Sequence, residues 1–311
     1  MTLITVLAGG VGAARYLAGQ LQVTSPSDVT AVVNVADDIE LHGLHVSPDI
    51  DTVVYTLSGA IDPERGWGLA DETWNALNEL RTLGIDAWFN LGDRDIGTHL
   101  FRTTLLRQGH TLSEATARLA AARGLGCRIL PVSDQPIETR VTLAEGTEIG
   151  FQEYFVRLAH DVAISGVRFA GSGDAHPAPG VLEAIDTAEV VVIAPSNPVV
   201  SIGPILAVRG VTEALAARRA RNVAVSPIVA GAALKGPADR MLRELGEEAS
   251  VVGVARRYRD VVGALVIDEA DAELAPAVDD AGVRPVVAPT IMSSPEAAAE
   301  LARRTMTAVS P

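Results

Sequence analysis

The stretch that decides the fold opens the chain: residues 3–15 read Leu-Ile-Thr-Val-Leu-Ala-Gly-Gly-Val-Gly-Ala-Ala-Arg. Its apolar run is typical of a buried strand, its glycines of a tight turn, and residues 12–21 of a helix. A strand that passes through glycines directly into a helix leaves backbone N–H groups free at the positive end of the helix dipole. The stretch therefore predicts a site for a phosphate or pyrophosphate group, with a purely structural turn as the alternative.

The glycines partly match the dinucleotide-binding pattern G-x-G-x-x-G, which begins here at Gly10 and continues at Gly12. Arg15 stands where the pattern has its third glycine. An arginine there would interfere with close packing of the helix on the strand, but its guanidinium could bind a phosphate. We therefore expect the phosphates of a nucleotide to be bound by Gly9, Gly10, Gly12 and Arg15.

The composition excludes several classes of protein. The 311 residues are 48% hydrophobic and 21% charged with a formal net charge of -14, and they suffice for one large α/β domain or two small ones. An acidic chain without basic patches predicts no nucleic-acid partner, although backbone N–H groups and a divalent metal would still allow it to bind a nucleotide. The single cysteine, Cys127, cannot form an intrachain disulfide, and no apolar run approaches the roughly 18 residues of a membrane span. We therefore expect a cytoplasmic protein without membrane contact.

Four carboxylates follow the second predicted strand, at 29–35. Asp37 and Asp38 come directly after it, and Asp49 and Asp51 follow within fifteen residues, on segments expected to be loops. Mg²⁺ prefers such oxygen ligands beside a substrate phosphate, so the group predicts a magnesium site that these four carboxylates share. Helix capping and turn formation are the alternative for any one of them. An acid after the second strand would also suit the ribose of a dinucleotide.

The segment of about 60–125 is expected to be mainly helical. One short strand is expected within it, at 87–91. Arg94, just beyond that strand, is a candidate substrate ligand or the partner of a neighbouring aspartate in a surface salt bridge. Trp67 and Trp74 would either stack on an aromatic ligand or belong to the core. The expected helices of this region lie at 53–57, 71–83, 98–108 and 112–123.

The sequence of the second half predicts further strands of the sheet and one antiparallel insert. Alternating apolar and polar residues from about 137 to 170, centred on Glu145-Gly146, predict a small antiparallel β insert that would serve as a lid or an oligomer contact. The run at 190–194 is apolar throughout and predicts a central parallel strand. For Lys235 a solvated surface position is the alternative to a phosphate contact. Candidate nucleotide ligands follow that strand and a later glycine-rich turn: Ser196, Asn197, Ser201 and Lys235.

Strands and helices alternate along the whole chain. This alternation predicts an α/β fold with a mainly parallel sheet. We expect one domain over 1–311, because the chain contains no low-complexity linker and no internal repeat. The other expected strands lie at 128–132, 223–225, 264–267 and 284–288, and the other helices at 180–186, 238–245, 254–262 and 295–306.

Long stretches of the sequence resemble one family, the 2-phospho-L-lactate and phosphoenolpyruvate transferases of coenzyme F-420 biosynthesis. Ala36 departs from the family pattern, in which a glycine is common at this place. The shared stretches run through nearly the whole chain: 9–15, 33–34, 37–38, 48–52, 66–68, 72–74, 88–89, 91–95, 151–155, 194–198, 201–206 and 235–239.

The resemblance implies a Mg²⁺-dependent transfer on a Rossmann-like three-layer α/β fold. The donor would be a guanosine diphosphate that carries lactate or enolpyruvate on its β-phosphate. The acceptor would be the deazaflavin alcohol called FO, whose terminal hydroxyl displaces GMP. The family also implies a homodimer, and the Ala- and Arg-rich composition favours enolpyruvate over lactate.

The same resemblance assigns roles to residues of this chain. Motif matches place the acceptor at Asp49, Thr52 and Arg94, and the donor phosphates at the glycine loop. A metal on the four aspartates would polarise the β-phosphate. Asp37 and Asp51 are the candidate catalytic residues, and whether either one acts as a base stays open at this point.

Two other functions also stay open. An NAD-dependent dehydrogenase would use the glycine loop and the acid after the second strand for its dinucleotide. A non-catalytic nucleotide-sugar-binding regulator of the same fold would bind its ligand without turnover. The acceptor-side motifs around Asp49 and Arg94 disfavour this regulator.

Overall fold

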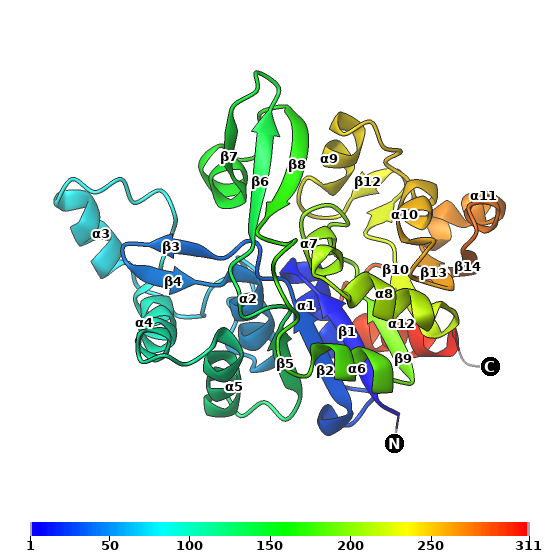
Figure 1. Ribbon diagram of the computed structural model, residues 1–311, viewed down its shortest axis with the longest axis horizontal. Coiled ribbons are helices and arrows are strands. Elements are labelled where there is room, and N and C mark those ends of the chain that lie inside the picture. Colours follow the sequence, from blue (N-terminus) through cyan, green and yellow to red (C-terminus); the bar gives the residue numbers. More distant parts are fainter. Residues whose placement is uncertain (1, 310–311) are drawn as a thin grey trace.

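A seven-stranded parallel sheet forms the centre of the computed structural model, which describes residues 2–309 (Figure 1). The strands are ordered β14-β13-β10-β9-β1-β2-β5, and every neighbouring pair is parallel. The predicted α/β fold with a mainly parallel sheet is confirmed. The sheet consists of β1 (Ile4–Ala8), β2 (Val29–Val33), β5 (Arg128–Pro131), β9 (Val190–Ile193), β10 (Asn222–Val225), β13 (Ala264–Ile267) and β14 (Arg284–Val287).

The order of strand addition reverses beside β1. From β1 the chain adds β2 and β5 on one side, and it later adds β9, β10, β13 and β14 on the other. Open α/β sheets bind their ligands at such a switch point, in the crevice at the carboxyl ends of the strands. Both β1 and β9 are buried along their whole length, as expected of central parallel strands. The glycine loop after β1 and the predicted ligands after β9 therefore meet at one edge of the sheet.

Helices cover both faces of the sheet. On one face α1 (Gly10–Gln20) packs against α2 (Pro48–Leu57) and α12 (Pro295–Thr307), and on the other α6 (Val181–Thr187) packs against α8 (Val211–Ala217). This three-layer arrangement follows from the crossovers between parallel strands, which place helices on both faces. The remaining helices of the second half are α7 (Gly203–Ala207), α9 (Ala238–Glu244), α10 (Val251–Tyr258) and α11 (Ala275–Asp280).

The predicted helical segment contains three helices, α3 (Asn75–Thr82), α4 (Asp93–Arg107) and α5 (Leu112–Ala122). The strand predicted at 87–91 is wrong, because this segment pairs with no strand among residues 2–309. Its apolar side chains pack instead on a hairpin, where Leu91 joins a small cluster that is separate from the main core. The apolar residues at 87–91 thus reflect this packing and not a place in the sheet.

The hairpin in question connects β2 to α2 and was not predicted. It consists of β3 (Ile39–Leu41) and β4 (Leu44–Val46), which pair antiparallel. Its turn, His42-Gly43, has φ angles of 52° and 75°, the left-handed conformation that two-residue hairpin turns require. The strands are too short to show a clear alternation in the sequence.

Two segments predicted to be loops are helix starts. α2 begins at Pro48, so Asp49 and Asp51 lie in its first turn. α4 begins at Asp93, so Arg94 lies in its first turn and not in a loop after a strand. Proline at the first helical position and aspartate in the first turn both favour a helix start, because the proline ring fixes φ and the carboxylate complements the helix dipole.

The antiparallel insert is confirmed as the three-stranded sheet β7-β6-β8, which stands clear of the parallel sheet at the top of Figure 1. Its strands are β6 (Glu138–Leu143), β7 (Glu148–Gly150) and β8 (Ile164–Ala170), with a π-helical turn at Glu153–Arg157 between the last two. A second small hairpin, β11 (Ile228–Val229) with β12 (Ala232–Ala233), precedes α9.

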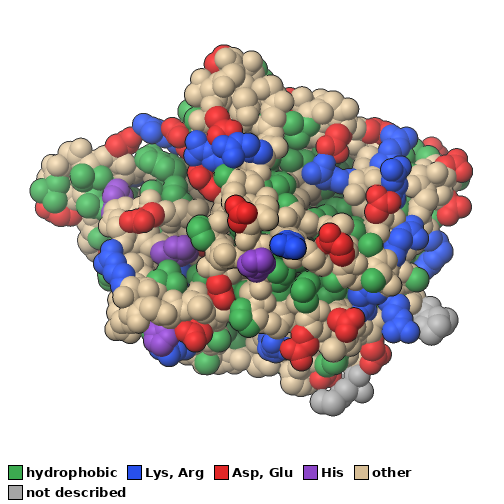
Figure 2. Space-filling model, in the orientation of Figure 1, with side chains coloured by type: hydrophobic (Ala, Val, Ile, Leu, Met, Phe, Trp, Pro, Cys, Tyr) green, Lys and Arg blue, Asp and Glu red, His purple; other side chains and the backbone are tan. Residues whose placement is uncertain are grey.

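The surface mixes charges of both signs. Over the face shown in Figure 2, arginine side chains are interspersed with aspartates and glutamates. Within residues 2–309 we find no helix whose length and apolar character would let it cross a bilayer.

Candidate active site

The glycine loop between β1 and α1 lies against the segment that follows β9. A Cβ added to Gly9 would stand 2.7 Å from the Cβ of Ser201, and one added to Gly12 would stand 2.2 Å from the carbonyl oxygen of Pro195. Gly10 begins α1 earlier than predicted, at a φ of 73°. Glycine is needed here because a side chain would block this approach. The structure thus brings these residues together, and the nucleotide they would bind stays a prediction.

Asp49 lies at the N-terminus of α1. Its Oδ1 accepts a hydrogen bond from the backbone N–H of Gly10 at 2.7 Å, and its Oδ2 accepts one from Asn34 Nδ2 at 2.9 Å. Burial raises the pKa of Asp49 to about 6, although the bonds from Asn34 and Gly10 oppose the shift. The carboxylate stands at the end of α1 where the sequence predicts a phosphate. The carboxylate group and the predicted phosphate site are therefore one region of the molecule.

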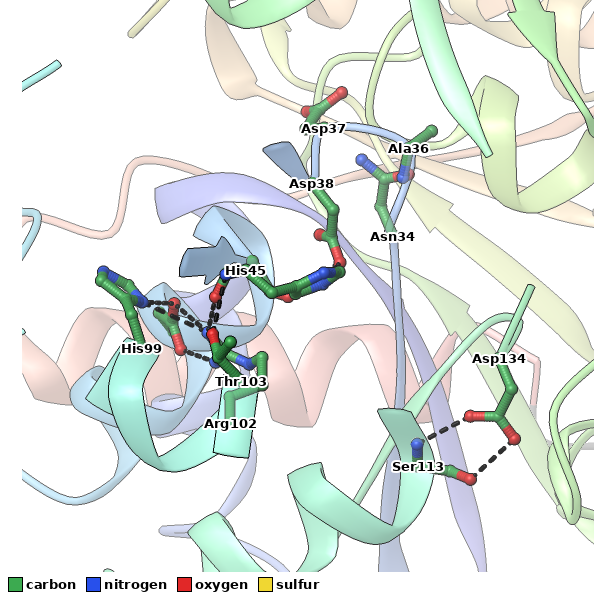
Figure 3. A network of polar contacts seen from close by, with 12 residues as sticks. Asn34, Ala36, Asp37, Asp38, His45, His99, Arg102, Thr103, Ser113 and Asp134 are labelled. Carbon is green, nitrogen blue, oxygen red and sulfur yellow. Dashed lines mark hydrogen bonds and ion pairs between the residues drawn. The ribbon is translucent and has the colours of Figure 1, made fainter. Parts of the chain in front are cut away.

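Asp37 and Asp38 stand near Asp49, on the loop after β2. Burial and the charge of Asp49 raise the pKa of Asp37 well above its usual range, and burial raises the pKa of Asp38 as well. Asp38 Oδ2 accepts a hydrogen bond from Ser47 Oγ at 2.7 Å and lies 2.9 Å from His45 Nε2 (Figure 3). The Oδ1 atoms of Asp37 and Asp38 are buried and have no hydrogen-bond partner in the described chain. Buried carboxylate oxygens are rarely left unpaired, so these two atoms indicate a place for a cation or a proton.

The predicted metal site is only partly preformed. Within residues 2–309 no group of three or more Asp, Glu, His or Cys side chains already converges in a geometry suited to a metal ion. Mg²⁺ commonly takes one or two carboxylates from the protein and completes its coordination with water and substrate phosphate. The unpaired oxygens of Asp37 and Asp38, with Asp49 nearby, fit a site of this kind.

Asp51, the fourth predicted ligand, has a different environment. Both of its carboxylate oxygens pair with the guanidinium of Arg102, which is 1% exposed, and its Oδ2 lies 3.2 Å from Arg102 Nη1. His99 lies close by, with its Nδ1 3.7 Å from Asp51 Oδ2. Because the ion pair engages both oxygens, this geometry favours a structural role for Asp51 over the predicted metal-binding and catalytic roles.

A cavity of about 210 Å³ opens beside Asp37 and Asp38, between the loop after β2 and the insert. Gln152 of the insert donates its Nε2 to the carbonyl oxygen of Asp37 at 3.2 Å, so the insert helps to hold this loop. Trp88 and Phe151 give the cavity aromatic walls. Such walls suit a planar ring with polar groups at its edge. The other lining residues are Ala36, Ile39, Glu138, Thr139, Arg140, Gly150 and Glu153.

The predicted acceptor residues lie in different surroundings. Asp49 belongs to the carboxylate group, and Thr52 is half-buried further along α2. Arg94 is exposed at the start of α4, where its guanidinium bonds the carbonyl oxygen of Ala70 and its backbone N–H donates to Glu72 Oε2 at 2.8 Å. Arg94 thus bonds the chain between α2 and α3 and not a neighbouring aspartate.

The predicted nucleotide ligands after β9 differ in burial and in the hydrogen bonds of their side chains. The hydroxyl of Ser196 is buried and has no hydrogen-bond partner within residues 2–309. Asn197 Oδ1 accepts the backbone N–H of Val199 at 2.9 Å, so this side chain shapes its own loop. Ser201, next to Gly9, is buried.

Arg15 and Lys235 are both exposed. Lys235 is the single lysine of the sequence, and its Nζ would stand 3.4 Å from a Cβ built on Gly66. The loop before α9 therefore reaches across to the loop between α2 and α3.

Trp67 and Trp74 form an edge-to-face pair with ring centroids 6.3 Å apart, and the guanidinium of Arg65 lies 5.4 Å and 5.6 Å from the two centroids. The three side chains line a second cavity of about 350 Å³. Trp67 is 40% exposed, so it does not belong to the core. Stacking on a ligand stays a prediction for this pair.

The residues that hold the carboxylates in place were not predicted. Asn34 bonds Asp49, His45 and Ser47 contact Asp38, and Arg102 pairs with Asp51. Arg102 and His45 are 57 positions apart in the sequence, so no local pattern connects them. The one local signal is Asn34, a polar residue directly after a buried strand.

Comparisons with known proteins point to one family. A family model described as 2-phospho-L-lactate transferase CofD matches residues 4–291. A phosphoenolpyruvate transferase of Kitasatospora aureofaciens is 47% identical over 306 residues, which cover 96% of this chain and 95% of that protein. Proteins of the same name from Streptomyces griseus (45% identical, 97% of each chain) and Mycolicibacterium smegmatis (42%, 96% of each chain) are also similar.

Among solved structures, a UPF0052-family protein of Bacillus halodurans aligns with a TM-score of 0.66 at 18% identity. The alignment covers 98% of this chain and 100% of that one. At this identity the likeness concerns the fold alone.

Proposed function

The chain belongs to the CofD family of 2-phospho-L-lactate transferases, and from this premise we propose that it transfers an enolpyruvyl phosphate group in coenzyme F-420 biosynthesis. The donor is a guanosine diphosphate that carries enolpyruvate on its β-phosphate, the acceptor is FO, and the leaving group is GMP. The names of the relatives, phosphoenolpyruvate transferase, support enolpyruvate over lactate as the transferred group.

One observation supports this proposal most strongly: partly unpaired carboxylates stand at the N-terminus of α1, at the switch point of the sheet. Asp49 reaches the N–H of Gly10 at 2.7 Å, and Asp37 and Asp38 each have a buried, unpaired oxygen in the described chain. Asp49 engages the N–H of Gly10, so the phosphate would use the remaining free N–H groups in the first turn of α1, and the carboxylates attract a divalent cation. A nucleoside diphosphate with its cation satisfies both demands at one place.

Mg²⁺ is the cation we propose, held by Asp37 and Asp38 with Asp49 adjacent. When bound, it would offset the negative charge that develops on the leaving phosphate. Asp51 stabilises the helix that bears Asp49, through its ion pair with Arg102.

We place the donor phosphates at the glycine loop, with the hydroxyls of Ser196 and Ser201 facing them from the segment after β9. The close approach of Ser201 to Gly9 and the unpaired hydroxyl of Ser196 support this placement. Asn197 holds the loop that bears both serines. The exposed cations Arg15 and Lys235 are outer contacts of the nucleotide.

We place the deazaflavin ring of FO in the cavity beside Asp37, between Trp88 and Phe151. Stacking on aromatic walls suits a planar tricyclic ring. Asp49, Thr52 and Arg94 are the proposed polar contacts of the ribityl chain.

In the proposed reaction the terminal hydroxyl of FO forms a bond to the β-phosphorus, and the bond from that phosphorus to the oxygen of GMP breaks. The hydroxyl proton passes to Asp37.

A mass-spectrometric assay tests the proposal. The purified chain is mixed with FO, Mg²⁺ and, in turn, the enolpyruvyl, lactyl and glyceryl guanosine diphosphates, and GMP release and the mass gain of FO are followed. We expect a product with the enolpyruvyl donor. Nucleotide binding without any product would support the regulator instead, and tight NADH binding without a response to these donors would support the dehydrogenase.

The proposal also includes a cytoplasmic homodimer without nucleic-acid or membrane partners. Light scattering after size-exclusion chromatography would give the mass of the assembly. A monomer at micromolar concentration would contradict the homodimer.

A further inference from the structure

The β3–β4 hairpin bears the side chain that contacts Asp38, and α4 holds this hairpin in place. His45 of β4 lies with its Nε2 2.9 Å from Asp38 Oδ2. Two consecutive residues of α4 bond the backbone of His45 (Figure 3): Thr103 Oγ1 accepts its N–H at 2.8 Å, and Arg102 Nη1 donates to its carbonyl oxygen at 3.3 Å. Both backbone groups of this one residue are thus bonded from the same helix.

The other contacts of the hairpin do not fix the position of His45 along the strand. Each of its strands has three residues, and a two-stranded hairpin of that size is marginal by itself. Its buried side chains Leu41 and Val46 belong to the small cluster with Leu91, apart from the main core. Apolar contacts are not directional, so they allow the hairpin to shift. The hydrogen bonds from Thr103 and Arg102 require a fixed geometry, and they therefore set the position of His45 along the strand.

Arg102 also connects α4 to α2. Its guanidinium pairs with both oxygens of Asp51, which lies in the first turn of α2 together with Asp49. A second bond between the helices runs from Tyr55 Oη to Asp95 Oδ1 at 2.6 Å. One buried guanidinium therefore contacts both the helix that bears Asp49 and the strand whose histidine contacts Asp38.

We infer that Arg102 and Thr103 are positioning residues, which set the carboxylate of Asp38 relative to that of Asp49 through the backbone of His45 and through α2. The inference rests on the proposed function, in which these carboxylates and the donor phosphates share a divalent cation. Asp38 Oδ2 is engaged by His45 and Ser47, and this contact directs the unpaired Oδ1. If His45 moved, Ser47 alone would hold the carboxylate of Asp38, and the direction of its unpaired Oδ1 would be less well fixed.

The test compares Thr103→Val with Thr103→Ser. Valine has nearly the shape of threonine but cannot accept the N–H of His45, whereas serine can. Arg107→Met is the matched control, because Arg107 lies on the same helix and donates to the same hairpin, but to the carbonyl oxygen of Gly43 in the turn, at 2.9 Å. Arg102→Lys is the complementary variant, and circular dichroism shows whether each variant folds.

Three quantities are measured on each folded variant: the dissociation constant of Mn²⁺ in the presence of GDP by electron paramagnetic resonance, kcat, and the KM for FO. Loss of a partner behind a metal ligand commonly weakens metal binding about 10- to 100-fold. We expect Thr103→Val to bind Mn²⁺ about tenfold more weakly and to lower kcat at unchanged KM for FO. We expect wild-type values in Thr103→Ser and Arg107→Met.

Equal Mn²⁺ dissociation constants for Thr103→Val and Thr103→Ser would overturn the inference, as would a wild-type protein that does not bind Mn²⁺. The Mn²⁺ measurement needs no turnover. If the wild type binds Mn²⁺ but forms no product, the proposed function fails while the comparison of variants still decides the positioning role.

Discussion

At the scale of single residues, Asp49 shows how burial and hydrogen bonds compete. The bonds from Gly10 and Asn34 favour its charged form, but burial outweighs them and raises its pKa to about 6. Folding with Asp49 ionised therefore costs free energy, and buried carboxylates with raised pKa values are typical of functional sites. A cation bound beside Asp49, as proposed, would compensate this cost.

The cost is measurable as a pH dependence. Between the usual pKa of 3.8 and the folded value of about 6, the folded chain binds the proton of Asp49 more tightly than the unfolded chain does. The free energy of unfolding therefore falls as the pH rises through this window, by about 3 kcal/mol at about 1.4 kcal/mol per pKa unit. Asp49→Asn removes this loss, so its stability relative to the wild type should increase between about pH 4 and pH 7.

Urea denaturation of both proteins without divalent cations measures this difference. Stability curves that stay parallel over the whole pH range would show that the folded pKa of Asp49 is not raised. Added Mg²⁺ should reduce the difference, because a bound cation compensates the charge.

Asp51 gives a second prediction at this scale. Asp51→Asn leaves the buried Arg102 without a counter-charge, and breaking such a pair costs about 3–5 kcal/mol. We expect a large loss of stability in urea denaturation and a loss of turnover that excess Mg²⁺ does not restore. Glu300→Gln breaks an exposed pair with Arg304 and serves as the control, with an expected cost of less than about 1 kcal/mol. If excess Mg²⁺ restored the turnover of Asp51→Asn, Asp51 would be a metal ligand as the sequence predicts.

At the scale of elements, the start of α1 shows why the glycine loop consists of glycines. α1 approaches the segment after β9 so closely that a Cβ on Gly12 would stand 2.2 Å from a backbone oxygen. Backbone cannot move aside as a flexible side chain can. The approach joins the two sides of the switch point, so the same residues that allow the fold also form the proposed phosphate site.

A pair of alanine variants separates this approach from the general effect of glycine in a helix. Gly12→Ala should cost about 1–3 kcal/mol, because the segment after β9 must shift, and it should weaken GDP binding. Gly97→Ala, at an exposed position of α4 with open space around its Cβ, should instead stabilise the protein by about 0.5–1 kcal/mol. Chemical denaturation and GDP titration measure both effects. An unchanged GDP affinity in Gly12→Ala would contradict the phosphate site at this loop.

At the scale of the whole molecule, the proposed site joins segments from both halves of the chain. Asp37 and Asp49 come from the first half, Ser196 and Ser201 from the second, and the insert closes the cavity beside Asp37. A ligand that contacts all of them holds the two halves together. Its binding should therefore stabilise the whole chain and not one element.

GDP with Mg²⁺ should raise the free energy of unfolding by about 2.7 kcal/mol when the free ligand is at a hundred times its dissociation constant. The reason is mass action, since the unfolded chain has no such site. Thermal melts with GDP and Mg²⁺, with GDP and EDTA, and with Mg²⁺ alone measure the effect. Equal melting temperatures in all three conditions would contradict the proposed nucleotide site.

The sequence by itself determined the architecture, and it predicts a place for the site. Its periodicity identified the sheet strands of β1, β9 and β13 and the insert, because burial on one or both faces of a strand produces a pattern in neighbouring residues. The glycine loop predicted the turn from β1 into α1, whereas its place at the switch point follows from the strand order. Long motifs added the family, which the comparisons confirm.

Only the tertiary structure decided the surroundings of the carboxylates. The sequence predicts one shared metal site for Asp37, Asp38, Asp49 and Asp51. The fold separates them, because Arg102 from a distant helix pairs with Asp51, while Asp37 and Asp38 keep buried, unpaired oxygens within residues 2–309. The partners of a buried charge are chosen by contacts between distant segments, and no local pattern in the chain records such contacts.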